Sequence, residues 1–323
     1  MVAVTVELAC HIPHPRPGTE LARAAQSLGP PAFTGRSCDW VEAELGNLLA
    51  VVDLAARTEG VPARAAAELV EVLQRPLVLT GRWGELERSG RAALAAAERE
   101  GDAVALALAQ RVLGRVAVNR GDLAGGSELF GSSLEHARRA GDLASAACTL
   151  MALGTMHGRA GEHQQAVARL QEALAAGAGQ HIPSITALTH NYLGEQYLHL
   201  RRTEPAHTQL TAGLLIARRF GDQDVMSMSL QLMGAAYQQF GDTDLALRYH
   251  LEGAEIAHAR GSLHSEAIAL THLSSTLLSS GQADAAADQL EQAATLFETH
   301  GDDHRAAALR SQAGVHRSAG ARV

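Results

Sequence analysis

The fold is decided by residues 141–162, which read GDLASAACTLMALGTMHGRAGE. A Gly-Asp pair opens this stretch and a Gly-Glu pair closes it 20 residues later, with apolar residues at helical spacing in between. Glycine ends a helix in the left-handed conformation, and the acidic side chain after it accepts free N–H groups of the next helix. A glycine followed by an acidic or polar residue recurs at steps of 20 or its multiples, at positions 101, 121, 141, 161, 221, 241, 261, 281 and 301.

A second series of residues recurs every 40 positions and sets the size of the repeat. It consists of Leu113-Gly114, Leu153-Gly154, Leu193-Gly194, Met233-Gly234 and Leu273-Ser274. The unit is therefore a pair of antiparallel helices, and one such pair cannot bury its own apolar stripe without neighbours. We predict an all-α, right-handed α-solenoid of about six helix pairs.

The chain is expected to divide into three parts. Residues 1–35 form an N-terminal extension or linker, and residues 36–99 form a capping helix and a first, degenerate helix pair. Residues 100–323 form the repeats and a C-terminal capping helix. The glycine corner is lost near residues 175–183 and 201–203, so a bend or kink in the superhelix is expected there.

Composition and charge exclude several classes of function. The chain of 323 residues contains no lysine, which excludes a lysine-dependent phosphate loop, a kinase site and a Schiff base. Its net charge of −8 argues against direct binding of nucleic acid or of an anionic membrane. The three cysteines are widely spaced and odd in number, which favours a reducing compartment. With neither a signal-like N-terminus nor a long apolar run, we expect a cytoplasmic protein.

The repeats resemble tetratricopeptide repeats (TPRs) with longer helices. The resemblance rests on a large residue followed by a small one in the first helix, and on small residues where the two helices cross. In this chain these are Leu153, Gly154, Ala166 and Ala173, then Leu193, Gly194, Ala206 and Gly213, then Met233, Gly234, Ala246 and Gly253, and Leu273, Ser274, Ala286 and Ala293. Small residues let two helix backbones approach closely.

The N-terminal third resembles the segment that opens the TPR region of AfsR-like and other antibiotic regulatory proteins of actinobacteria. The resemblance rests on Pro31-Ala-Phe33, on the helix from Asp39-Trp40 through Glu42, Glu44, Asn47 and Leu48, and on Gly81-Arg82-Trp83. It implies the sensor part of a transcription regulator of secondary metabolism, or a stand-alone relative. The alternative for Trp40 is a structural one, in which it caps the end of the solenoid.

The resemblance to TPRs implies a concave groove lined by the first helix of each pair. Carried over from the Leu-Gly register, the polar residues that point into it are Arg111, Arg115, Asn119, Arg159, Asn191, Glu195, His199, Gln231 and Gln238. Amides can pair with the backbone of an extended peptide, and arginines can hold a carboxylate or phosphate. We predict a non-enzymatic binding module for a peptide, protein segment or small effector, with no cofactor and no metal.

Three alternatives remain open at this stage. The polar inner face can be a merely solvated surface, or the chain can be a scaffold that joins two proteins through an apolar surface. An enzyme using Glu195, His199 or Cys148 would need a closed pocket. His250 stands where the repeat expects a packing residue, so we predict a half-buried structural histidine. A homodimer is possible.

Overall fold

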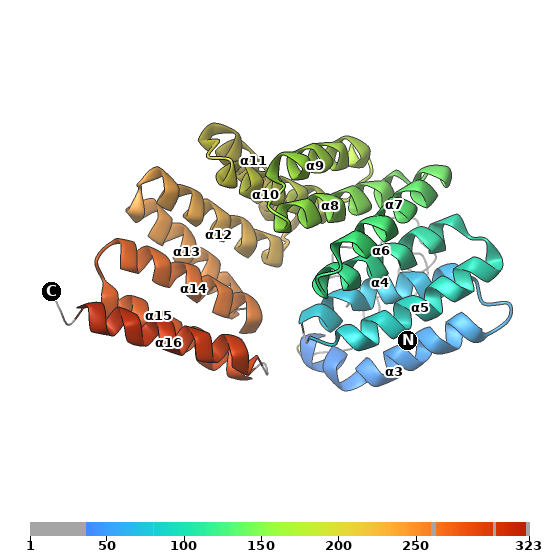
Figure 1. Cartoon of the computed structure of the whole chain (residues 1–323), viewed down its shortest axis with the longest axis horizontal. Coiled ribbons are helices and arrows are strands. Elements are labelled where there is room, and N and C mark those ends of the chain that lie inside the picture. The colour runs from blue at the N-terminus through green and yellow to red at the C-terminus, as the bar shows by residue number, and fades with distance from the viewer. Residues whose placement is uncertain (1–36, 80, 260–262, 300–301, 321–323) are drawn as a thin grey trace. The chain divides into compact units, whose positions relative to one another are not determined.

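The computed structural model describes residues 37–79, 81–259, 263–299 and 302–320. This part of the chain consists of fourteen α-helices joined by short turns (Figure 1). Their bounds are α3 Ser37–Arg57, α4 Ala63–Leu79, α5 Trp83–Glu100, α6 Ala103–Asn119, α7 Leu123–Arg139, α8 Leu143–Arg159, α9 His163–Gly177, α10 Pro183–His199, α11 Thr203–Phe220, α12 Gln223–Phe240, α13 Thr243–Ala259, α14 Leu263–Ser279, α15 Ala283–Thr299 and α16 Asp303–Gly320.

Consecutive helices pack as antiparallel pairs, as in α6 with α7, α8 with α9, α12 with α13 and α14 with α15. The predicted all-α class and the TPR-like α-solenoid are confirmed. We call the first helix of each pair an A helix (α4, α6, α8, α10, α12 and α14) and the second a B helix (α5, α7, α9, α11, α13 and α15). The helix α3 precedes these six pairs and α16 follows them.

The corners form as the sequence predicts. At the corner between α7 and α8, Gly141 has a φ of +65°, and the side chain of Asp142 accepts the N–H of Ser145 at 2.8 Å. At the lost corner, Arg201 takes the position that is elsewhere glycine, with a φ of +57°. At the other lost corner, His181 has a φ of +49°, just before Pro183 begins α10. The bend or kink of the superhelix remains a prediction.

The pairs are held together by a large B-helix side chain that packs over a glycine of the A helix. A Cβ added to Gly154 would lie 2.5 Å from Cγ of Leu170, and the same pairing joins Gly114 to Phe130 and Gly194 to Leu210. The partner residues are fully buried. The remaining core is largely alanine and leucine, which is why the helices pack closely despite few aromatic residues.

The chain divides into two compact units, residues up to Ile185 (unit 1) and residues from Thr186 onward (unit 2). The predicted boundaries at 35 and 99 remain predictions. The N-terminal extension and the Pro31–Phe33 motif lie outside the described residues, as does the side chain of Trp40. Across the described residues, none of the helices has the length and apolar character needed to span a membrane.

Candidate functional site

The candidate site is the face formed by successive A helices. In unit 1, α4 contacts α6 and α6 contacts α8; in unit 2, α12 contacts α14. Residues 40 apart therefore stand at equivalent places on neighbouring A helices. The nine predicted site residues are distributed over four of these helices, and the structure separates them into buried and exposed groups.

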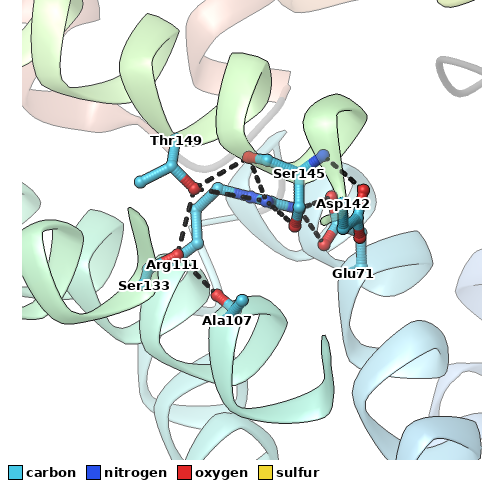
Figure 2. A network of polar contacts seen from close by, with 7 residues as sticks. All are labelled: Glu71, Ala107, Arg111, Ser133, Asp142, Ser145 and Thr149. Atoms are coloured by element: carbon cyan, nitrogen blue, oxygen red, sulfur yellow. Dashed lines mark hydrogen bonds and ion pairs between the residues drawn. The ribbon is translucent and has the colours of Figure 1, made fainter. Parts of the chain in front are cut away.

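Arg111 on α6 lies at the centre of a buried polar network (Figure 2). Its Nη2 donates to both carboxylate oxygens of Glu71 on α4. Its Nη1 donates to the Ser145 backbone carbonyl at 3.3 Å and to Ser145 Oγ at 3.1 Å, both on α8. Thr149 Oγ1 lies 3.5 Å from the same nitrogen. One guanidinium thus joins three consecutive A helices.

Further hydrogen bonds from the B helix α7 complete this network. Ser133 on the B helix α7 donates to the carbonyl of Ala107 at 2.7 Å and lies 3.0 Å from Thr149 Oγ1. Burial opposes the charged form of Arg111, but Glu71, Cys148 and Asp142 together outweigh it and raise the pKa of the guanidinium. Arg111 is therefore a charged, buried tie between helices, with an exposed fraction of 4%.

Asn191 on α10 is also buried, with an exposed fraction of 0%. Its Nδ2 donates to Ser229 Oγ of α12 at 2.8 Å, and the hydroxyl lies 3.0 Å from Asn191 Oδ1. A Cβ on Gly213 of α11 would lie 2.4 Å from the same Oδ1, so glycine leaves the room that the amide occupies. Like Arg111, Asn191 links one A helix to the next.

Two further predicted site residues, Gln231 and Gln238 on α12, are also hydrogen-bonded to other side chains. Gln231 is buried, and its Nε2 lies 3.4 Å from Ser227 Oγ. Gln238 is half-buried and reaches α14, where its Nε2 donates to Ser275 Oγ at 3.3 Å and to Ser279 Oγ at 3.0 Å. Arg111, Asn191, Gln231 and Gln238 therefore all make polar contacts with other side chains of the fold.

The other five keep part or all of their side chains at the surface. Arg115 and Glu195 are half-buried, and Asn119, Arg159 and His199 are exposed. Asn119 and Arg159 have no polar partner among the described residues, and they stand 40 positions apart on α6 and α8. The ligand-binding role of all nine residues remains a prediction.

Sequence reasoning missed the partners of the buried residues, namely Glu71, Ser145, Thr149 and Ser229. A signal for two of them exists in the 40-residue register, because Thr149 and Ser229 occupy the same place on α8 and α12 and both are fully buried. Thr149 Oγ1 accepts a hydrogen bond from Arg111, and Ser229 Oγ accepts one from Asn191, in each case from the neighbouring A helix.

Two further expectations concern Cys148 and His250. Cys148, which occupies a groove position of α8 in the TPR register and which an enzyme built on this fold would use, has a buried side chain. His250 was expected to be half-buried, and its exposed fraction is 0%, because Gly234 leaves the whole ring room against α12. Among the described residues, no group of three His, Cys, Asp or Glu side chains is arranged to hold a metal ion.

No protein-family model and no curated protein matches the chain. Several solved structures do match in fold. A Rap protein complexed with Competence and Sporulation Factor has a TM-score of 0.60 at 12% identity, covering 99% of this chain and 86% of that one. A Signal Transduction ATPase with Numerous Domains from Pyrococcus horikoshii, described as having a TPR sensor, has a TM-score of 0.60 at 14% identity.

That match covers 92% of this chain and 47% of the ATPase chain. The anaphase-promoting-complex hetero-tetramer Cut9–Hcn1 gives a TM-score of 0.60 at 14% identity, covering 97% of this chain and 52% of that one. At these identities the likeness establishes the fold, a TPR-like repeat protein. The resemblance to actinobacterial regulators stays a prediction.

Proposed function

We propose that this TPR-like repeat protein is a non-catalytic binding module whose A helices hold a peptide, a protein segment or a small effector. The proposal rests chiefly on Asn119 and Arg159. They occupy equivalent positions on the contacting helices α6 and α8, both are exposed, and neither has a polar partner among the described residues. The two side chains offer an amide and a guanidinium to the same stretch of surface.

The chemistry of these groups defines the ligand that fits. An amide both donates to and accepts from a peptide backbone, and a guanidinium pairs with a carboxylate or phosphate through two parallel hydrogen bonds. Arg115 lies one turn before Asn119 on α6 and is half-buried. It adds a second cation to this surface, beside the exposed Arg159. A ligand with an anionic group is therefore favoured, although the chain as a whole carries a net charge of −8.

We further propose that the module is the sensor part of a regulator. Support comes from the resemblance of residues 31–50 and 81–83 to actinobacterial antibiotic regulatory proteins, and from the shared fold with an ATPase described as having a TPR sensor. In such an arrangement, the ligand stabilises one of two forms of the regulator and shifts their populations. Glu195 and His199 on α10 are the corresponding contacts proposed for unit 2.

Native mass spectrometry of the purified chain, before and after denaturation, tests the binding function. The expected result is a retained molecule that is lost from the Asn119→Ala/Arg159→Ala variant, with its Kd raised by roughly tenfold or more. Arg138→Ala is the matched control, because Arg138 is exposed on the B helix α7 and has no polar partner among the described residues. Equal retention by the wild type and the double variant would contradict the assignment.

The second candidate is a stand-alone scaffold that binds proteins through its B helices. Leu215 and Phe220 of α11 are 61% and 53% exposed, and Leu251 of α13 is 47% exposed. A purified chain that retains no molecule, but whose complex with a protein partner is lost in Leu215→Glu/Leu251→Glu and kept in Asn119→Ala/Arg159→Ala, would favour this function.

A further inference from the structure

One position of the packing register carries a histidine. Phe130, Leu170 and Leu210 pack over Gly114, Gly154 and Gly194, and the next member of the series is His250 over Gly234. A Cβ at position 234 would lie 2.5 Å from Cε1 of the imidazole and 2.6 Å from both ring nitrogens. The imidazole thus occupies the slot that an apolar side chain fills in the other pairs.

This slot gives the imidazole no polar contact. His250 has an exposed fraction of 0%, and both of its ring nitrogens are buried without a hydrogen-bond partner among the residues that the structure describes. A neutral imidazole leaves a donor and an acceptor unsatisfied there, and an imidazolium would leave two donors and a full charge. Burying an unpaired charge costs far more than burying a neutral polar group.

Among the described residues, no acidic side chain bonds to the buried ring. From α12 the ring meets Gly234, and from α14 it meets His272, whose ring is stacked on it with centroids 5.7 Å apart and planes at 7°. An ion pair between α13 and α11 joins Glu252 to Arg218 on the exposed side, and Tyr249 of α13 stacks on Tyr237 of α12. The charged group that does act on His250 is another potential cation.

The fold lowers the pKa of both His250 and His272. Burial, and then the neighbouring His272, lower the pKa of His250 from 6.5 to about 4. Desolvation by the surrounding helices also lowers the pKa of His272, although much of that residue remains exposed. The folded chain therefore holds both rings neutral at pH values where free histidine is charged.

We propose that the stacked pair His250–His272 is an acid-sensitive joint between α13 and α14, at which proton uptake by the buried imidazole opens this part of unit 2. Protonation places an unpaired cation in an apolar slot next to a second ring that can also become charged. The packing of α13 on α12 and of α14 on α13 then loses its stability. Repeat proteins can open locally in this way, because each repeat is held mainly by its neighbours.

The direction of the effect follows from proton linkage. A histidine whose pKa is lower in the folded chain binds protons preferentially when unfolded, so stability is full above about pH 6.5 and falls towards pH 4. The difference between 6.5 and about 4 corresponds to a roughly 300-fold rise in the opening equilibrium constant at the acid limit. Between pH 7 and pH 5 the expected rise is about 20-fold.

Hydrogen exchange of the full chain, corrected for the intrinsic pH dependence of exchange, tests the joint. Protection of α12, α13 and α14 is expected to fall by about 20-fold between pH 7 and pH 5, while α7, α8 and α9 in unit 1 serve as the internal reference. In His250→Leu, which installs the residue found at positions 170 and 210, this local fall is expected to shrink to the part that His272 contributes. In His272→Gln it should become smaller.

Two results would overturn the proposal. One is an equal loss of protection in the wild type and in His250→Leu, or in unit 1 and in α12–α14. The other comes from NMR titration of the histidine Cε1 protons, which needs no stability change: a His250 pKa near 6.5 would show that the buried ring takes up a proton without opening the fold. Should His250→Leu fail to fold, the titration and His272→Gln decide the question.

Discussion

Leu170 of α9 packs directly over Gly154 of α8, leaving no room for a side chain at position 154. An added Cβ would lie 2.5 Å from Cγ and 2.8 Å from Cδ2 of Leu170, and 3.3 Å from the backbone oxygen of Ala166. Gly154→Ala is therefore expected to lower the free energy of unfolding by about 1–2 kcal/mol, because overpacking outweighs the better helix propensity of alanine. Urea unfolding followed by circular dichroism measures this change.

The control for this substitution is Gly131→Ala on the neighbouring helix α7. A Cβ at Gly131 meets nothing within 4 Å, so alanine should raise the free energy of unfolding by roughly 0.5–1 kcal/mol. Equal effects of Gly154→Ala and Gly131→Ala would show that α8 and α9 can move apart slightly without a loss of stability.

Removal of the Arg111 side chain is expected to destabilise unit 1. Arg111→Ala leaves Glu71 without its guanidinium and opens a gap among α4, α6 and α8, so a loss of about 3–5 kcal/mol is expected. Arg111→Met, which keeps most of the volume, should lose less, since Glu71 is 31% exposed and can be hydrated. Thermal and urea unfolding give both values.

Arg138→Ala is the matched control for the loss of an arginine. Arg138 is exposed and has no polar partner among the described residues, so its removal should change stability by no more than about 0.5 kcal/mol. A similar small effect of Arg111→Ala would mean that the buried network contributes little to stability.

The pair of Asn191 and Ser229 invites a double-mutant cycle. Each side chain bonds to the other, and Ser229 is also 2.8 Å from the carbonyl of Val225. We expect Asn191→Ala and Ser229→Ala to be non-additive, with a coupling energy of about 0.5–2 kcal/mol, because either substitution alone already breaks the contact between α10 and α12. Additive effects would show that the lost stability comes from the cavities that the two substitutions create, and not from the hydrogen bonds between the two side chains.

Asp102 gives a pH dependence that can be separated from that of His250. Burial raises the pKa of this carboxyl, but the N–H of Ala105 and the guanidinium of Arg64 outweigh burial and lower it below its usual 3.8. A lowered carboxyl pKa stabilises the fold above about pH 3.8, and this contribution is lost as the pH falls below that value. Acid titration of unfolding at pH 3–5 therefore distinguishes the two groups.

Asp102→Ala should cost about 1–2 kcal/mol at pH 7, because the carboxylate caps α6 through Val104 and Ala105. The cost should shrink below pH 3.8. Glu98→Ala is the control, since Glu98 is exposed and has no polar partner among the described residues. An Asp102→Ala cost that stays constant down to pH 3 would contradict the lowered pKa.

Arg201 stands in a backbone conformation that favours glycine. Its φ of +57° occurs at the place equivalent to Gly161 and Gly241, and an L side chain costs roughly 1 kcal/mol in this region. Arg201→Gly is expected to stabilise unit 2 by about 0.5–1 kcal/mol, with the gain reduced by the freer unfolded chain. The reverse change at a regular corner, Gly241→Ala, should destabilise; thermal unfolding of both variants provides the comparison.

The sequence predicted the helix pairs and their corners because these depend on local chemistry. Gly141 and Asp142 end one helix and start the next through their own backbone and side chain, whatever the neighbouring repeat does. The burial of Arg111 and Asn191 could not be read from the same pattern. Their positions border both the inner face and the contact with the next A helix, and the spacing of those helices decides which way the side chain points.

The buried tie formed by Arg111 also bears on how the chain avoids stacking its repeats in the wrong order. If α6 stacked on α12 instead of α8 during folding, the guanidinium would meet Val225 at the place of Ser145. The guanidinium would keep Glu71 but lose the Ser145 hydroxyl, and a buried donor without its acceptor is costly, whereas alanine and leucine would tolerate the exchange. We therefore expect Arg111 to favour α8 over α12 as the neighbour of α6, so an Arg111→Met chain should populate more skipped-repeat misfolds on refolding.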